Sequence, residues 1–383
     1  MGPLAGLKVI ELAGLGPAPF CGMLLGDMGA DVVRVDRPEA ADLGIEFPTE
    51  FDLRNRNKRS VAIDLKKPEG LAVFLRLAEQ ADIVLEGFRP GVAERLGLGP
   101  EACFARNPRV VYGRATGWGQ GGPLAMAAGH DINYIALTGA LHCIGPAGGA
   151  PVPPLNLLGD YGGGALYLAF GLLSALFEAQ RSGRGQVVDA AMIDGVTSLM
   201  TVFHALRQMG EMRPERGANA LDGGAPYYTT YETADGRHVA VGAIEPRFYD
   251  ELLRRLGIDA ATLPPRDDRT RWPEARQRLA AVFRTRKRDD WVRHFEGSDA
   301  CFSPVLALDE VAGHPHNRAR EALIERDGIL QPSPAPRLSR TPGTVARGAP
   351  QRGEHSDEIL QDWGFTPAEI LRSRHDGSLG VRG

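Results

Sequence analysis

The chain has 383 residues, of which 43% are hydrophobic, and carries a formal net charge of −4. It is longer than one usual domain, so we expect two packed units or one unit with an insertion. The near-balanced charge and scattered arginines argue against a nucleic-acid-binding protein. Four widely separated cysteines lack metal-site spacing and predict reduced thiols in a cytoplasmic protein. The spacing of cysteines and histidines predicts no bound metal. No apolar run approaches the length that spans a bilayer, so we expect no membrane partner.

The N-terminal stretch predicts a β-α-β unit: an apolar strand over 7–12, a helix over 20–28 and a second strand that ends at Asp36. In a dinucleotide-binding fold, the first turn would read G-x-G-x-x-G. Here Pro19 replaces the third glycine and Pro17 also lies in the turn, so two N–H donors for a pyrophosphate are missing. Arg37 adds a positive charge that suits a phosphate. The stretch indicates a nucleotide-type fold but argues against NAD.

Strand and helix patterns then alternate as far as residue 192. We expect strands in 60–65, 82–88, 109–117 and 186–192, and helices in 68–81, 132–141 and 165–179. This alternation predicts an α/β domain with a parallel sheet covered on both faces.

The pattern changes after about residue 205. A D-G turn within 227–243 indicates a hairpin, and helical patterns follow over 246–256 and around Trp291. We therefore predict a large domain over 1–205, a smaller α+β domain over 206–315, and a Pro- and Arg-rich C-terminal segment over 316–383 that returns to the large domain, with a short helix capped by Ser356.

Three ionisable residues stand at predicted helix starts. His130 follows Gly129 and precedes Asp131, and Asp160 lies in the glycine-rich sequence "LLGDYGGGA". A histidine and a carboxylate so placed could act as paired acid and base, and the helix start after Asp160 could bind an oxyanion through the N–H groups of residues 160–162. Glu245 ends a strand pattern before Pro246. The alternative is that all three are ordinary helix-start residues.

Several long motifs occur in order along the chain, including "GLKVIELAGLGPAPFCGMLLGDMGADVVRVDRP", "EGFRPGVAERLGLG", "AGHDINYIALTGAL" and "PPLNLLGDYGGGALYLAFGLLSAL". On these motifs the chain resembles the family III coenzyme A transferases, and within them the racemases of 2-methylacyl-CoA thioesters. The resemblance implies a Rossmann-like large domain, a smaller domain and an interlocked homodimer. It also implies that coenzyme A belongs to the substrate and that no separate cofactor is needed.

The resemblance assigns site residues by motif. His130 and Asp160 become the two proton-transfer groups, and Glu245 the partner of His130. The implied substrate-binding residues are Arg37, Ile63, Asp64, Leu65, Lys66, Arg95, Gly129, Asp131, Ile132, Asn133, Tyr134 and Asn156, with Arg89 a rival to Arg95.

Three other functions stay open at this point. The first is a coenzyme A transferase in which Asp160 is a nucleophile. His130 with Glu245, and only a short glycine run at Gly223 and Gly224, favour the racemase. The second is an NAD-dependent dehydrogenase, disfavoured by Pro17 and Pro19, and the third is an acyl-CoA-binding protein without catalysis.

Overall fold

The computed structural model describes residues 2–39 and 47–380, and its contacts divide the chain into two compact units. Unit 1 comprises Met1–Thr138, Leu155–Leu199 and Arg318–Gly383, and unit 2 comprises Gly139–Pro154 and Met200–Asn317. The expected domain limits at 205 and 315 stay a prediction.

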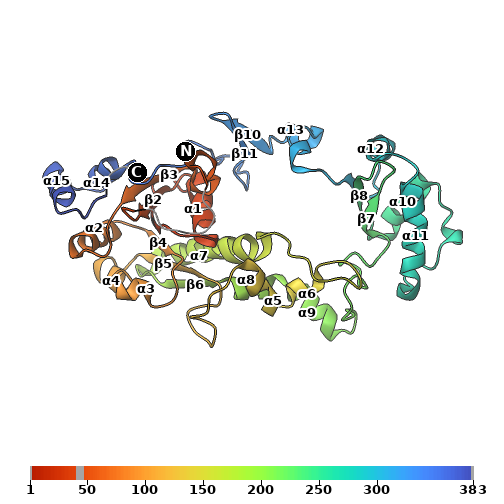
Figure 1. The fold of residues 1–383 in the computed structure, drawn as a ribbon, viewed down its shortest axis with the longest axis horizontal. Helices are drawn as coiled ribbons and strands as arrows, with labels where there is room; N and C mark the ends of the chain where they lie inside the picture. Colours follow the sequence, from red (N-terminus) through yellow and green to blue (C-terminus); the bar gives the residue numbers. More distant parts are fainter. Residues whose placement is uncertain (1, 40–46, 381–383) are drawn as a thin grey trace. The chain divides into compact units, whose positions relative to one another are not determined.

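Unit 1 contains a six-stranded sheet in the order β3-β2-β1-β4-β5-β6, with every pair parallel (Figure 1). This confirms the expected α/β class with a parallel sheet. Because the strand order reverses between β1 and β4, the loops after these two strands diverge and leave room for a ligand at their carboxyl ends. The strands are β1 (Lys8–Leu12), β2 (Asp31–Asp36), β3 (Lys58–Ala62), β4 (Ile83–Glu86), β5 (Val111–Thr116) and β6 (Val187–Ala191).

Helices bury apolar side chains against both faces of this sheet. One core includes side chains of α1 (Pro17–Asp27) and α7 (Leu166–Ser182), and the other includes side chains of α2 (Pro68–Ala78), α4 (Pro100–Arg106), α14 (Ser356–Asp362) and α15 (Pro367–His375). The remaining helices of unit 1 are short: α3 (Val92–Arg95), α5 (Asp131–Leu137), α8 (Met192–Leu199), η1 (Thr49–Phe51) and η2 (Leu53–Asn55).

The long helix of unit 1 differs from the sequence prediction. It begins with η3 (Leu157–Ala165), a π-helical turn, and continues as α7, so residues 157–182 form one apolar helix that could by length and composition cross a membrane. The expectation that no apolar run approaches that length is therefore wrong. Within α7, Leu168, Leu172 and Ala175 are buried in the sheet core, and core helices pass the same length test.

Unit 2 is an α+β unit with its own core. Its antiparallel sheet has the order β7-β8-β9 and packs against helices through aromatic side chains such as Trp272, Phe283 and Trp291. Its elements are β7 (Tyr228–Glu232), β8 (His238–Gly242), β9 (Phe302–Pro304), α6 (Ala140–Cys143), α9 (Thr201–Gln208), α10 (Pro246–Leu256), α11 (Trp272–Phe283), α12 (Arg288–Phe295), η4 (Ala260–Thr262), η5 (Arg269–Arg271) and η6 (Leu308–Glu310), and α13 (Pro315–Ala319) follows where the chain returns to unit 1.

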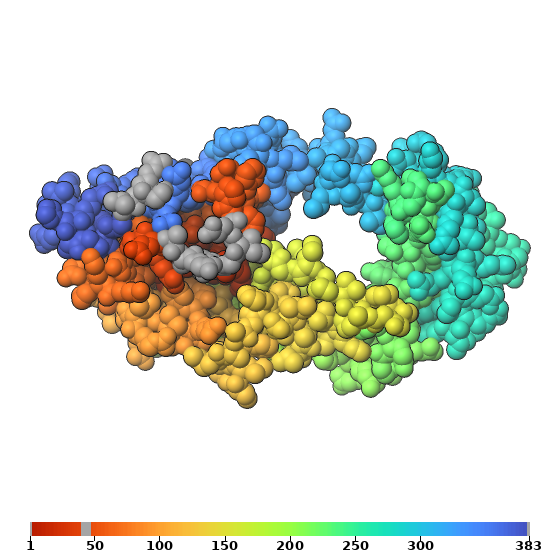
Figure 2. Space-filling view, viewed as in Figure 1, coloured from red at the N-terminus to blue at the C-terminus, as the bar shows by residue number. Residues whose placement is uncertain are grey.

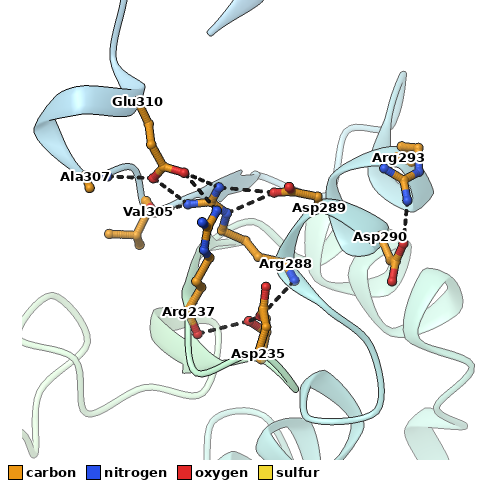
Figure 3. A network of polar contacts seen from close by, with 10 residues as sticks. Asp235, Arg237, Arg288, Asp289, Asp290, Arg293, Val305, Ala307 and Glu310 are labelled. Carbon is orange, nitrogen blue, oxygen red and sulfur yellow. Dashed lines mark hydrogen bonds and ion pairs between the residues drawn. The ribbon is translucent and has the colours of Figure 1, made fainter. Parts of the chain in front are cut away.

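A buried arginine, Arg288, forms hydrogen bonds to the segment over 305–310 of unit 2 (Figure 3). The guanidinium of Arg288 donates to both carboxylate oxygens of Glu310, at 2.6 and 2.8 Å, and to the Val305 carbonyl oxygen at 3.0 Å. Arg237 donates to the same Glu310 carboxylate at 2.8 Å. The segment over 305–310 is thus connected to α12 and to the residue before β8 by charge-assisted hydrogen bonds.

The C-terminal segment adds a hairpin, β10 (Leu323–Arg326) and β11 (Ile329–Pro332), and then packs against the N-terminal part of unit 1. In the space-filling view its dark blue residues lie directly against the orange residues of the N-terminal third (Figure 2). Arg59 of β3 donates to Glu358 and Asp362 of α14, at 2.9 and 2.6 Å. The expected short helix is present, but its N-cap is His355, so the predicted cap at Ser356 is wrong by one residue.

Candidate active site

His130 and Asp160 stand at the starts of two different helical elements of unit 1. His130 is the N-cap of α5, where its backbone N–H donates to the side-chain oxygen of Asn133 at 3.0 Å, and its side chain is exposed. Asp160 lies in the first turn of η3 and is half-buried. π-Helical turns are rare and occur frequently at functional sites. The wide turn therefore supports Asp160 as the functional candidate that its glycine-rich sequence indicated.

The carboxylate of Asp131 joins these two helix starts. Its Oδ2 accepts the N–H of Gly159 at 2.6 Å and the N–H of Asp160 at 2.8 Å. The expected role of the Asp160 N–H as an oxyanion donor is wrong, because that N–H already has an acceptor. The N–H groups of Tyr161 and Gly162 stay predictions in that role.

The surroundings of Asp160 favour its protonated form. Burial raises the pKa of this carboxyl, and the negative charge of Asp131 raises it further. Three groups oppose this and lower the pKa: Asn156, which donates to Asp160 Oδ2 at 3.0 Å, and the positive charges of His130 and Arg54. A carboxyl whose pKa is shifted toward neutrality exchanges protons more readily at cellular pH than an exposed aspartate does.

The turn after β1 comes close to Asp160. A Cβ added to Gly16, which has a φ of 71°, would lie 3.6 Å from Asp160 Oδ1. The ring of Phe20 on α1 also lies 4.4 Å, centroid to centroid, from that of Tyr161. Asp160 is thus near the carboxyl end of β1, beside the point where the strand order reverses. Open α/β sheets bind ligands at this place.

Two of the segments that are predicted to contact coenzyme A lie side by side in the structure. Arg37 follows β2 and Ile63 follows β3, and the N–H of Ile63 donates to the carbonyl oxygen of Asp36 at 2.9 Å, so both segments share the carboxyl edge of the sheet. Arg37 and Lys66 are exposed there, whereas Ile63 is buried and Leu65 packs on the core. Asp64 belongs to the second of these segments, where its Oδ1 accepts the N–H of Lys66 at 3.1 Å. The other predicted contact residues lie elsewhere in unit 1: Arg95, Gly129, Ile132, Asn133, Tyr134 and Asn156. Their contacts with substrate stay predictions.

The start of α1 is unsuited to a dinucleotide. Pro17 and Pro19 both lie in its first turn, so two N–H donors are absent. Asp36, the residue that would bind a ribose, is buried and already bonded to Arg34 at 2.9 Å and to Ser60 at 2.6 Å. The geometry of this turn agrees with the argument against NAD.

Glu245 belongs to unit 2, where it is the exposed N-cap of α10. Its assignment as the partner of His130 stays a prediction. Over residues 2–39 and 47–380, no group of three or more His, Cys, Asp and Glu side chains is arranged to hold a metal ion.

Sequence reasoning missed two contributors to the site. Asp131 was assigned to substrate binding, but its carboxylate faces Gly159 and Asp160. Arg54 was not assigned, although its charge acts on Asp160. The contact of Asp131 with Gly159, 28 residues later in the chain, was not visible in the sequence, because such contacts depend on tertiary structure.

Comparison with known proteins gives a consistent assignment. Residues 4–356 match the family described as CoA-transferase family III. The chain is 48% identical over 375 residues to alpha-methylacyl-CoA racemase of Mus musculus and 45% identical over 375 residues to that of Homo sapiens, in each case covering 97% of this chain and 96% of the relative. A CAIB/BAIF family protein from Brucella suis has a crystal structure that superimposes with a TM-score of 0.82 at 28% identity, covering 94% of this chain and 99% of that one. The chain therefore belongs to CoA-transferase family III.

Proposed function

We propose that this chain is a racemase that interconverts (2R)- and (2S)-2-methylacyl-CoA thioesters without a separate cofactor. The observation that carries the proposal is the pair His130 and Asp160, two proton-transfer groups at two helix starts of one unit that interact electrostatically. The relatives named alpha-methylacyl-CoA racemase, at 45–48% identity over 97% of the chain, support the same activity.

Inversion at the α-carbon needs a base on one face and an acid on the other. His130 removes the proton from one face while Asp160 returns a proton to the opposite face, and the roles reverse for the other enantiomer. Because burial and Asp131 raise the pKa of Asp160, its carboxyl is better suited to donate a proton than an exposed aspartate. Glu245 is proposed to orient His130.

The intermediate is an enolate of the thioester, formed when the α-proton leaves. Its oxygen needs fixed donors, and the N–H groups of Tyr161 and Gly162 are the remaining candidates in η3. Arg37 and Lys66, both exposed at the carboxyl edge of the sheet, are proposed to bind phosphates of the coenzyme A moiety. This remote binding energy holds the α-carbon between the two bases.

The test is configuration of the α-carbon after incubation with one enantiomer of 2-methylacyl-CoA. The wild-type protein should produce an equal mixture of enantiomers, and His130→Ala and Asp160→Ala should each abolish inversion. Inversion that survives in either variant would contradict the assignment of that residue as a proton-transfer group.

A coenzyme A transferase is the second candidate, favoured by the half-buried Asp160 carboxylate beside a helix start, which could attack a thioester. In that case Asp160 would form an acyl anhydride and then a thioester with coenzyme A. Hydroxylamine added after mixing with acyl-CoA would convert the Asp160 thioester to a hydroxamate detectable by mass spectrometry. Its detection, together with dependence of turnover on a free carboxylic acid, would favour the transferase.

We also propose that the protein is an interlocked homodimer. Along α7, Leu166, Phe170, Leu173 and Phe177 form an exposed apolar stripe opposite the residues that pack on the sheet, with Phe170 72% and Phe177 62% exposed. Such a stripe favours a protein partner. Analytical ultracentrifugation should show a dimer for the wild type and weakened association for Phe170→Glu, whereas a monomeric wild type would contradict the proposal. The expected cytoplasmic location stays a prediction.

A further inference from the structure

We propose that Asp131 is a positioning residue that fixes the separation between His130 and Asp160. This inference rests on the function proposed above, because it assigns a task within the same two-base reaction. The task is mechanical: one carboxylate ties the element that carries one base to the element that carries the other.

The connection is short and direct. Asp131 follows His130 in the chain and is the first residue of α5, and its Oδ2 accepts N–H groups from Gly159 and from Asp160 itself, at 2.6 and 2.8 Å. The fit leaves no space, since a Cβ on Gly159 would lie 2.5 Å from the same oxygen. A single oxygen atom therefore links the backbone beside one proposed base to the backbone of the other.

The burial of Asp131 indicates that this contact is more than an ordinary helix cap. The residue is 6% exposed, and its Oδ1 is buried without a hydrogen-bond partner among the described residues. Burying a carboxylate with one unsatisfied oxygen is costly, whereas an exposed aspartate would stabilise the start of α5 without that cost. The hydrogen bonds from the N–H groups of Gly159 and Asp160 explain why this carboxylate is buried.

The charge of Asp131 acts on Asp160 as well. Besides burial, the groups with the largest effect on the pKa of Asp160 are Asn156, Asp131, His130 and Arg54, and Tyr134 also interacts with Asp160. Asp131 is the negative charge in this set. Its removal should lower the pKa of Asp160. A variant that retains the acceptor oxygen but removes the charge can therefore separate the electrostatic effect from the mechanical one.

Loss of positioning should have a specific signature in a two-base reaction. A displacement of about 1 Å at a reacting group can cost about a hundredfold in rate. If the turn that carries Asp160 moves, inversion fails, but His130 can still remove the α-proton from its own face and return a solvent deuteron to that face. The result is α-deuterium exchange with retention of configuration, for one enantiomer only.

The experiment compares Asp131→Ala and Asp131→Asn with the wild type in deuterated water, using each enantiomer of 2-methylacyl-CoA separately. Inversion and α-deuterium incorporation are followed by chiral analysis and NMR. The matched control is Asp82→Asn: Asp82 Oδ2 accepts the N–H of Lys8 at 2.8 Å before β4, at the amino end of the sheet and away from the site. The control should behave as the wild type.

Asp131→Ala should lower inversion about a hundredfold while exchange with retention persists from one enantiomer. Asp131→Asn keeps an acceptor oxygen, so inversion should stay within about tenfold of the wild type, and the limb of the pH profile of kcat/KM due to Asp160 should move to lower pH.

Unchanged inversion in Asp131→Ala, or an equal loss of inversion and exchange from both enantiomers, would overturn the inference. If Asp131→Ala fails to fold by circular dichroism, Asp131→Glu, which keeps the charge but moves the acceptor oxygen by one methylene group, is judged by the same two criteria. Failure of the proposed function would look different, because the wild type and the Asp82→Asn control would then show neither inversion nor exchange.

Discussion

Replacing Lys58 with methionine should destabilise unit 1 and disturb the turn that approaches Asp160. Lys58 lies in β3 and is 0% exposed. Its Nζ donates to Glu11 Oε1 at 2.7 Å, to the Pro19 carbonyl oxygen at 2.9 Å and to Asn55 Oδ1 at 2.9 Å. One ammonium group thus joins β1, the first turn of α1 and the segment that includes η2.

The size of the stability loss in Lys58→Met follows from the Glu11 carboxylate, which stays buried without its partner. Glu11 is also 0% exposed, and its Oε2 has no partner within the described part of the chain. Removing one partner of a buried ion pair costs about 3–5 kcal/mol, because the other charge stays buried without compensation. At about 2–4 °C per kcal/mol for a domain of this size, the melting temperature should fall by roughly 10 °C.

The stability loss in Lys58→Met should depend on pH. Burial raises the pKa of Glu11, and the positive charge of Lys58 partly offsets this. Without Lys58 the pKa of Glu11 rises further above its unfolded value, so stability is lost as pH rises through the folded pKa. The variant should therefore lie closer to the wild type at pH 5 than at pH 8.

Differential scanning calorimetry at both pH values measures these effects, with exposed Lys66→Met as the stability control. The double variant Glu11→Leu with Lys58→Met should recover most of the loss, since no buried charge remains. A deficit below about 1 kcal/mol at pH 8, or one that grows as pH falls, would refute the reasoning.

Three further outcomes are expected. Gly16→Ala should lower the free energy of unfolding by about 1 kcal/mol, because residue 16 has a φ of 71°. It should also slow racemisation on the order of tenfold, because the new methyl group would lie 3.6 Å from Asp160 Oδ1. Chiral analysis of the product measures this rate. Burial raises the pKa of Glu86 to about 7, above its unfolded value. The free energy of unfolding should therefore fall by about 3 kcal/mol as pH rises from about 5 to 8. In urea titrations at these pH values, Glu86→Gln should show no such fall. Arg288→Met should lower the stability of unit 2 by about 2 kcal/mol through loss of its bonds to Glu310, as monitored by tryptophan fluorescence, and an unchanged transition would contradict the role drawn in Figure 3.

Much of unit 1 was predictable from the sequence because hydrophobic runs in a buried parallel sheet are nearly continuous. The six strands lie where apolar runs such as 7–12 and 82–88 predicted them. The start of α1 was less visible, since Pro17 and Pro19 suggested a turn, whereas prolines in the first helical turn lose no intrahelical hydrogen bond.

Other elements depend on contacts that local pattern does not encode. The helix expected over 132–141 is divided into α5 and α6, because Gly139 adopts a φ of 80°. The short strand β9 forms only because β8 supplies its partner more than 60 residues earlier in the chain. The π-helical turn at Asp160 donates two backbone N–H groups to Asp131, and no local pattern distinguishes this turn from an α-helical start.

In the candidate site, too, the sequence predicted some features and the structure was needed for others. The glycine-rich context identified His130 and Asp160 as candidates, and the motifs assigned their roles. The hydrogen bonds that Asp160 makes with Asp131 and Asn156, and the effect of the Arg54 charge on Asp160, required the structure.

The most direct test of the central claim is incubation of the wild-type protein with one enantiomer of 2-methylacyl-CoA in deuterated water, with no free carboxylic acid present. The two-base reaction predicts that the inverted product carries deuterium at the α-carbon and forms without any acyl acceptor. No inversion and no exchange, with coenzyme A moving only after a carboxylic acid is added, would contradict the racemase and favour a transferase.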